Sequence, residues 1–447
     1  MLRKPTLRLV LTVACLAACG DDDSSATDTG VDAFDSGTDA VVDAAVDQGV
    51  DVEVPYTCET AIAETTPVLL APSFRRAEIH PAAAFDGEHI WIALSATDDP
   101  GPPTACTGDD TTPCEEGQSC SDDVCVHNGF DVALVRMRCD GVLEDPIMIS
   151  EATPPSDIDP AIAIAEDRVI LAWQRDEGTG TIRTALRAYD LEGNPLGETT
   201  TYASVRGGEP VEGTVWFPSL MPKSDGFWLW GIRGIDEVGG FLGYLQELDE
   251  SGAPVGEGQD VFFEGASTGQ NGFELAPRGD DLHWAWTEHE QAVYLAPDAT
   301  EPRLLLEGFV GSSVGGLTVQ NDRVLAVVQA GAASATINLV DAESGTRSEV
   351  GRGRVASPFL ATGDGDEGVV LWLGDARGFV AEELWVRSYQ YDGAEFTLGD
   401  ARTVATLGSL GIPYRPSVHH LRDGFYLVTW AEREGDTWRS YAQILDL

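Results

Sequence analysis

The feature that most constrains the fold of this chain is an internal repeat that recurs seven times from about residue 80 onward. Each unit opens with a short run led by proline or small residues, turns at Asp or Gly, and enters a strongly apolar run. A polar segment and a run of alternating apolar residues complete the unit. Repeated units bury their apolar faces against their neighbours, so the repeat decides the architecture. The openings are residues 80–83, 159–162, 217–220, 272–275, 315–318, 357–360 and 415–418.

The turn residues of the repeat predict antiparallel strands. The third run of each unit ends near an Asp, and in most units a Gly follows shortly after it. Asp and Gly between apolar runs are the turn chemistry of β-hairpins. We therefore expect about four strands in each unit of about 40 to 60 residues. The Asp residues are Asp140, Asp190, Asp249, Asp298, Asp341, Asp392 and Asp446.

Seven such units resemble a seven-bladed β-propeller, an all-β fold of four-stranded antiparallel blades. The last unit reaches only its third strand at Asp446, whereas an extra strand, Pro67-Val68-Leu69-Leu70, precedes the first unit. Pairing of this N-terminal strand with the last blade would close the ring and remove two exposed sheet edges. Two packed β-sandwich domains are the alternative, which the absence of a linker in the middle of the chain disfavours.

Tryptophan closes the apolar second run in five of the units. Because these rings end strongly apolar runs, we expect them to pack between blades, and a set of ligand-stacking rings is the alternative. The five are Trp173, Trp230, Trp286, Trp372 and Trp430.

The cysteines predict disulfides. The chain has eight, of which Cys15 lies in an N-terminal segment with the pattern of an export signal and Cys19 directly follows that segment. The remaining even number is typical of an exported, oxidised protein. Six cysteines allow 15 pairings, which the sequence does not distinguish. An insertion in the first unit, residues 98–128, has almost no apolar core, so we expect two local disulfides there and a third between Cys58 and Cys139. Zinc binding is the alternative, disfavoured by export and by the lack of paired Cys-x-x-Cys motifs. The six are Cys58, Cys106, Cys114, Cys120, Cys125 and Cys139.

The N-terminus has the pattern of an export signal. Arg3, Lys4 and Arg8 accompany an apolar run over residues 9–18, which is shorter than the roughly 20 residues a membrane-spanning helix needs. The run ends in Leu16-Ala17-Ala18-Cys19, which resembles the lipobox of bacterial lipoproteins. The resemblance implies a signal peptide over residues 1–18 and a lipid anchor on Cys19. Gly20 follows Cys19, and the resemblance then implies an outer-membrane lipoprotein of the cell envelope, facing the periplasm or the exterior.

An acidic tether follows, over residues 19–54. Between Asp21 and Val54 the chain carries ten Asp, one Glu and no Lys or Arg, with no apolar stripe, so we expect a disordered linker. The whole chain has a formal charge of −48, which repels nucleic acid and anionic lipid headgroups but is compatible with cationic partners. We expect the folded domain to occupy residues 55–447 and to be monomeric.

The propeller resemblance places a ligand site at the loops around one mouth of the channel. In this acidic protein those loops are rich in arginine, and arginine beside acids and Trp would suit an anionic or sugar-like ligand. A row of surface ion pairs is the alternative. The candidate residues are Arg75, Arg76, His80, Asp157, Asp159, Arg175, Trp216, Arg233, Glu288, His289, Arg377, Arg415, Glu432 and Arg433.

The chain carries no recognisable catalytic motif. A nucleophile elbow, a phosphate loop and a His-Glu-x-x-His pair are absent, and residues 363–368 are typical of a hairpin turn rather than a calcium loop. We therefore expect no catalytic residue, metal or cofactor, and predict a membrane-anchored, non-catalytic protein-binding scaffold. A glycan-binding or glycan-cleaving propeller is the alternative. A glycan-cleaving mouth would bring two carboxylates within about 10 Å, whereas a scaffold would present an exposed apolar patch.

Overall fold

The structure is a computed structural model of the 447-residue chain. The chain divides into two units, Met1–Val54 and Pro55–Leu447, and the described residues all belong to the second. The predicted signal peptide, Cys19 and the predicted tether therefore lie outside the described residues. Described are residues 58–71, 76–77, 81–97, 118–121, 124–127, 130–149, 156–165, 167–176, 182–202, 205–206, 209–210, 216–235, 241–263, 273–279, 281–288, 291–299, 301–307, 313–331, 335–353, 359–374, 383–407, 416–434 and 437–447.

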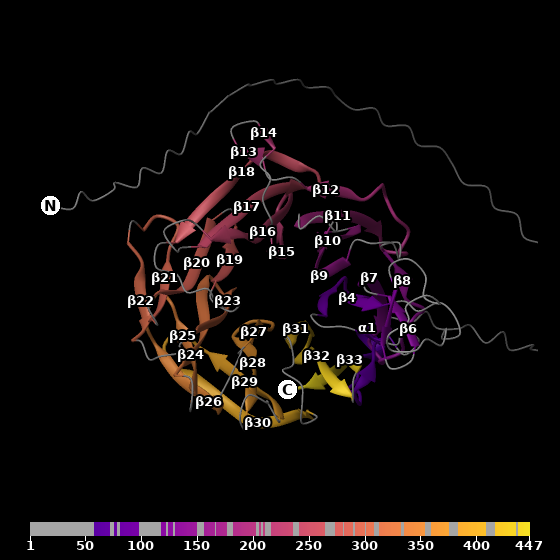
Figure 1. The fold of residues 1–447 in the computed structure, drawn as a ribbon. Helices are drawn as coiled ribbons and strands as arrows, with labels where there is room; N and C mark the ends of the chain where they lie inside the picture. The colour runs from indigo at the N-terminus through magenta and orange to yellow at the C-terminus, as the bar shows by residue number, and fades with distance from the viewer. Residues whose placement is uncertain are drawn as a thin grey trace, which may run out of the picture. The chain divides into compact units, whose positions relative to one another are not determined.

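Seven antiparallel sheets follow one another around a ring, which confirms the seven-bladed propeller (Figure 1). We number these blades 1 to 7 in chain order. The first three are β3 (Ala82–Phe85), β4 (His89–Thr97), β7 (Asp131–Arg138) and β8 (Ile147–Met148), with β2 (Arg76–Ala77) also paired to β4; β9 (Ser156–Ala165), β10 (Arg168–Asp176), β11 (Ile182–Asp190) and β12 (Thr200–Tyr202); and β15 (Trp216–Lys223), β16 (Gly226–Ile235), β17 (Phe241–Asp249) and β18 (Pro254–Phe263).

The remaining blades repeat the same order of strands. They are β19 (Phe273–Arg278), β20 (Asp281–Glu288), β21 (Gln291–Leu295) and β22 (Arg303–Leu306); β23 (Ser313–Gln320), β24 (Arg323–Ala330), β25 (Ala335–Asp341) and β26 (Arg347–Gly353); β27 (Phe359–Thr362), β28 (Glu367–Gly374), β29 (Glu383–Tyr391) and β30 (Phe396–Thr406); and β31 (Ser417–Arg422), β32 (Phe425–Glu434) and β33 (Thr437–Asp446) with β1 (Val68–Leu69). Two small hairpins, β5 (Gln118–Ser121) with β6 (Val124–His127) and β13 (Val205–Arg206) with β14 (Glu209–Pro210), form separate two-stranded sheets.

The N-terminal strand closes the ring, as the sequence predicts. β1 pairs antiparallel with β33, Val68 opposite Ala442, and the Leu70 amide donates to the Ser440 carbonyl oxygen at 2.9 Å. Figure 1 shows the yellow C-terminal blade beside indigo N-terminal segments. A disulfide joins Cys58, in the single helical turn α1 (Cys58–Ala61), to Cys139 with a Cα–Cα distance of 5.4 Å, which confirms this expected pair.

The Asp at the end of the third strand has a structural role in the turn that follows, as Asp249 of blade 3 shows. Asp249 Oδ1 accepts hydrogen bonds from the Ser251 amide at 2.8 Å and the Ala253 amide at 2.9 Å, so its side chain organises the turn into β18. Gly252 has a φ of +81°, a conformation that glycine adopts without steric cost.

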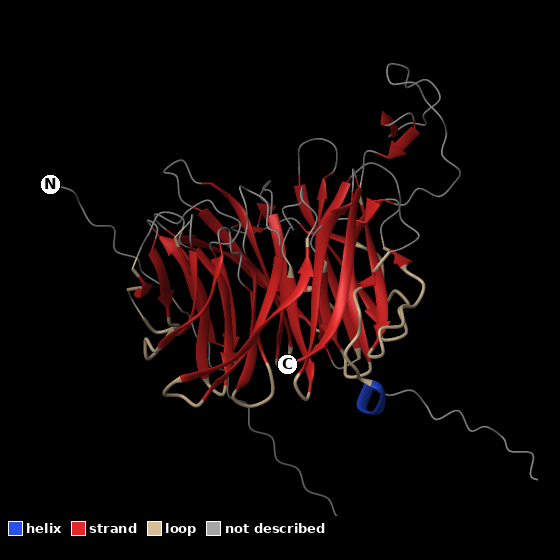
Figure 2. Cartoon of the chain, turned by 90° about the horizontal axis from the view of Figure 1, so that it is seen from below, coloured by secondary structure: helices blue, strands red, loops and turns tan. Residues whose placement is uncertain are grey.

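Described loops gather at one face of the ring (Figure 2). In blade 4, β21 ends at Leu295, before the expected Asp298.

The apolar core is divided among the seven blade junctions. Among the described residues, seven hydrophobic clusters each combine side chains of two neighbouring blades, including the junction of blade 7 with blade 1. The predicted packing of the Trp rings is confirmed: Trp173 is 0 % exposed and Trp430 1 %, and the other three are also buried. Burial excludes ligand stacking. The second strands continue past these rings; β16 runs beyond Trp230 to Ile235. No described helix is both long and apolar enough to cross a membrane.

Candidate functional site

The structure tests the predicted arginine-rich mouth at few positions. Arg75, His80, Arg377 and Arg415 lie outside the described residues. Arg76, Trp216, Arg233 and Arg433 belong to described strands, but their side chains lie outside the description. The hypothesis of an arginine-lined mouth therefore stays a prediction. Asp159 is described, together with its neighbours on blade 2.

Blade 2 presents an ion pair where β9 begins and β10 ends. Asp157 and Arg175 are cross-strand partners, and the guanidinium donates two hydrogen bonds to the carboxylate, Nε to Oδ1 at 3.0 Å and Nη2 to Oδ2 at 2.8 Å. Asp157 is 1 % exposed, and the Arg175 guanidinium also lies over the Trp173 ring at 5.8 Å. This bidentate pair fixes both side chains. At this position the structure shows Arg175 in an ion pair with Asp157.

Asp159 occupies a strained position in the same strand. Its φ is +52°, although a proline follows it, and the pairing of β9 with β10 slips between Ala172 and Gln174. The Gln174 amide donates a hydrogen bond to the Asp159 carboxylate. Phe217 on blade 3 repeats this geometry, with a φ of +54° before Pro218 and a slip in the same part of the strand. In blades 2 and 3 the opening X-Pro is thus a β-bulge that redirects the X side chain, a device common beside binding sites.

Ser417 and His419 form a further polar contact, near the end of a strand on the side of the predicted mouth. His419 Nε2 lies 3.1 Å from Ser417 Oγ, and burial lowers the pKa of His419 to about 4, so the ring is neutral at pH 7. Ser417 Oγ is also 2.6 Å from Thr429 Oγ1, and the Thr429 hydroxyl donates to the Pro81 carbonyl oxygen at 3.2 Å. These hydroxyl groups connect blade 7 to blade 1, so their geometry is accounted for by ring closure. The described residues form no group of three or more His, Cys, Asp or Glu side chains able to hold a metal.

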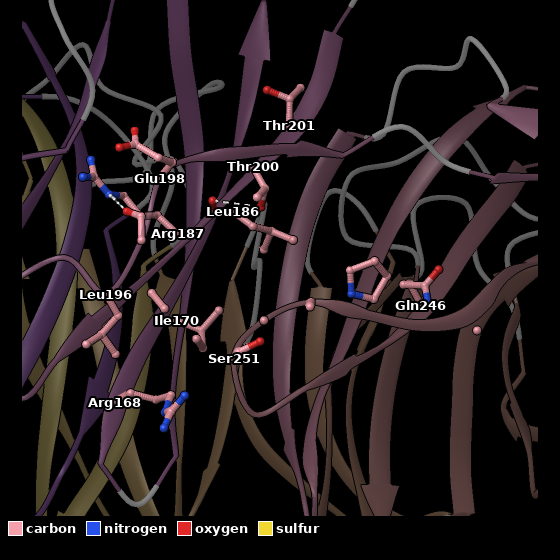
Figure 3. A pocket seen from close by; sticks show the side chains of 16 residues that line it. Arg168, Ile170, Leu186, Arg187, Leu196, Glu198, Thr200, Thr201, Gln246 and Ser251 are labelled. Atoms are coloured by element: carbon pink, nitrogen blue, oxygen red, sulfur yellow. Dashed lines mark hydrogen bonds between the residues drawn. The ribbon is translucent and has the colours of Figure 1, made fainter.

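A groove of about 600 Å³ opens between blades 2 and 3, away from the predicted mouth (Figure 3). One wall is built by the second and third strands of blade 2 and the loop before β12, with Ile170, Leu186, Ala188 and Leu196. The other wall is the β17–β18 turn of blade 3, around Ser251. Ile170 is 0 % exposed and forms part of the floor, whereas Leu196 is 51 % exposed at the rim.

Several polar side chains of this groove already have partners. Arg187 Nε donates to the Gly197 carbonyl oxygen at 3.2 Å and Nη1 to that of Ile149 at 3.4 Å. Gln246 Nε2 donates to the Val255 carbonyl oxygen at 3.0 Å, and its Oε1 accepts from the Tyr244 hydroxyl. None of the described residues lining the groove is aromatic. The groove is therefore suited to apolar contacts rather than to sugar stacking or catalysis.

Sequence reasoning missed this groove. Its walls come from segments about 50 to 80 residues apart, and no local motif marks them. The segments that form its walls carry small residues, Ala188, Gly197, Gly252, Ala253 and Gly256, which by themselves do not predict a groove. The Gly363–Gly368 segment, by contrast, is the hairpin turn that its sequence predicts, between β27 and β28.

Comparisons with known proteins give fold relatives and no family. No protein-family profile and no curated protein matches the chain. Similar structures include a protein of unknown function from Dyadobacter fermentans (12% identity, 87% of this chain and 99% of that chain, TM-score 0.48) and an oligogalacturonate lyase from Vibrio parahaemolyticus (12%, 85% and 96%, 0.48). A GH43_1 enzyme from Xanthomonas citri in complex with xylotriose is also similar (12%, 65% and 94%, 0.35). Likenesses at this level carry no argument about activity.

Proposed function

We propose that this chain is a lipoprotein of the cell envelope, anchored through Cys19 in the outer membrane, whose propeller binds a protein partner without catalysis. The lipobox Leu16-Ala17-Ala18-Cys19 and the acidic tether after it support export and anchoring. A tether that repels itself would hold the propeller away from the membrane, where a partner can reach it.

The observation that carries the binding role is the groove between blades 2 and 3. An apolar groove of about 600 Å³ with a half-exposed Leu196 at its rim is the kind of concave apolar surface that marks an interaction site. Of the described carboxylates near the predicted mouth, Asp157 is held by Arg175 and Asp159 accepts a hydrogen bond from Gln174.

The proposed occupant is an extended protein segment with apolar side chains flanked by Lys or Arg. A groove of about 600 Å³ has the volume of a site for a few side chains, and Ile170, Leu186 and Leu196 supply apolar contact within it. The chain's charge of −48 favours the approach of a basic segment and makes its association rate fall with salt.

A photo-cross-linking amino acid placed at Leu196 tests this site in intact native cells. The matched control is the same amino acid at Leu304, which is 44 % exposed on blade 4 and does not line the groove. We expect one dominant adduct from position 196 and none from 304. A synthetic peptide of the captured segment should bind the purified protein and bind the Leu196→Asp variant at least about tenfold more weakly. Equal capture at both positions, or a peptide that binds both forms equally, would sink the proposal.

The anchor has a separate test. Cys19→Ala removes the only acceptor that the lipobox offers, so we expect the protein to move from the membrane fraction to the soluble exported fraction. Globomycin, which blocks the lipoprotein signal peptidase, should leave the wild-type chain with residues 1–18 attached. Membrane retention of the Cys19→Ala protein would contradict the anchor while leaving the groove untouched.

A further inference from the structure

The hairpin inside the insertion of blade 1 places two cysteines at directly opposite positions of its two strands. β5 (Gln118–Ser121) and β6 (Val124–His127) pair antiparallel, and the register sets Cys120 directly opposite Cys125. Only residues 122 and 123 separate the two strands. Cys58 and Cys139 already form a disulfide, so four cysteines remain to be paired, with three possible arrangements.

The position of this pair in the hairpin favours a disulfide. In a hairpin with a two-residue loop, the residues that flank the loop, here Ser121 and Val124, form the hydrogen-bonded pair. Cys120 and Cys125 are therefore a non-hydrogen-bonded pair, whose Cα atoms lie about 4.5 Å apart in antiparallel sheets. Disulfides form at Cα separations of about 4.4 to 6.8 Å. The backbone thus holds these two residues within bonding range without rearrangement.

The isolation of the hairpin explains why it would need such a bond. β5 and β6 form a two-stranded sheet with no third strand among the described residues. A lone four-residue hairpin is marginally stable in water, and this insertion has almost no apolar core. A covalent link across the strands removes many of the open conformations of the chain and keeps the hairpin formed.

We infer that Cys120 and Cys125 are joined by a disulfide. Cys106 and Cys114 lie outside the described residues and are the two cysteines that then remain for the second local disulfide. Forming each bond removes two protons and two electrons from two thiols. A disulfide-bearing oxidant of the exported compartment takes them by thiol–disulfide exchange and is itself reduced to two thiols. The inference rests on the proposed export, because the cytosol keeps such thiols reduced.

Peptide mapping of the full-length protein from native cells, alkylated without reduction, distinguishes the three arrangements. The chain offers Asp109 and Asp110 between the first two cysteines, Glu115 and Glu116 between the next two, and Asp122 and Asp123 between the last two. Cleavage at Asp and Glu therefore separates all four cysteines onto different peptides. We expect a Cys120 peptide linked to a Cys125 peptide, and a Cys106 peptide linked to a Cys114 peptide.

The Cys58–Cys139 peptides serve as the internal control. If Cys58–Cys139 is oxidised while Cys120 is alkylated or linked to Cys106 or Cys114, the inferred pairing is wrong and export is unaffected. If all six are alkylated, both the pairing and the proposed export are overturned. In a Cys120→Ser variant, we expect one alkylated thiol, at Cys125. Release of Cys106 or Cys114 instead would contradict the pairing.

Discussion

Two junctions of the ring are built from equivalent strands but are filled by different side chains. One lies between blades 2 and 3 and the other between blades 5 and 6. At the junction of blades 5 and 6 the cluster contains Trp372, Tyr389 and Tyr391, with Trp385 and Phe396 packed against them. At the junction of blades 2 and 3, alanines occupy much of the cluster, and the large groove opens beside Ile170 and Leu186. Radial sheets diverge toward the rim, so large rings are needed there to keep a junction closed.

Hydrogen bonds reinforce the filled junction. The Tyr391 hydroxyl donates to the buried Asp341 carboxylate at 2.5 Å, and the Tyr389 hydroxyl donates to Gln320 Oε1 at 3.1 Å, both from blade 6 to blade 5. Gly351 leaves the space that the Trp372 ring occupies, since a Cβ there would lie 2.5 Å from the ring. The comparison shows that aromatic rings and cross-blade hydrogen bonds fill the junction of blades 5 and 6, whereas a groove opens beside the junction of blades 2 and 3.

The largest expected effect comes from emptying the filled junction. Trp372→Ala removes a ring that is 3 % exposed and stacked 6.3 Å from Trp385, so we expect a loss of about 4 kcal/mol in the free energy of unfolding. Ile170→Ala, beside a groove that is already open, should lose about 2 kcal/mol. Urea unfolding followed by Trp fluorescence and circular dichroism measures both. Equal losses would show that the two junctions do not differ in packing.

Removing a hydrogen bond across the filled junction should have an intermediate effect. Tyr391→Phe keeps the ring but removes the donor to Asp341, which is 0 % exposed, so we expect a loss of about 2 kcal/mol. Tyr244→Phe in blade 3, where the partner Gln246 keeps its other bonds, is the matched comparison and should lose about 1 kcal/mol. If the Tyr391→Phe protein is as stable as the wild type, the hydrogen bond from Tyr391 to Asp341 does not stabilise this junction.

The same carboxylate predicts a pH dependence. Burial raises the pKa of Asp341, but hydrogen bonds from Tyr391 and from the Ser344 and Glu343 amides outweigh it, so the pKa lies below the usual range. A lowered folded-state pKa gives stability that is present above the unfolded pKa, about 3.9, and lost as pH falls through the folded pKa. We expect the stability difference between wild type and Asp341→Asn to shrink below about pH 4. A difference that stays constant down to pH 2 would contradict the assigned pKa direction.

The smallest expected effect on stability comes from filling the open junction. Ala188→Leu places apolar carbon in the groove, where partial burial should stabilise the fold by up to about 1 kcal/mol. The same side chain should block the proposed partner, so peptide binding falls while the melting temperature does not. Normal binding by this stable variant would move the interaction site elsewhere on the propeller.

Much of the fold is predictable from sequence because its determinants are local. Asp249 and Gly252 act on the turn in which they lie, and the alternating apolar runs set which strand faces are buried. Closure by Val68 and Leu69 follows from counting strands, and the Cys58–Cys139 pair follows from pairing the four cysteines of the insertion among themselves. The positive φ of Asp159 and Phe217 is less predictable, since proline at the next position gives no warning of a left-handed residue.

The sequence by itself determined the number of blades, their order, the closing strand and the acidic, lipobox-bearing N-terminus. These follow from turn chemistry, strand periodicity and charge, which act between residues close in the chain. Only the tertiary structure decided that Asp157 is bound by Arg175 and that a groove opens beside Leu186. The reason is physical: the volume left at a junction depends on side chains from two blades, far apart in sequence, meeting at one radius.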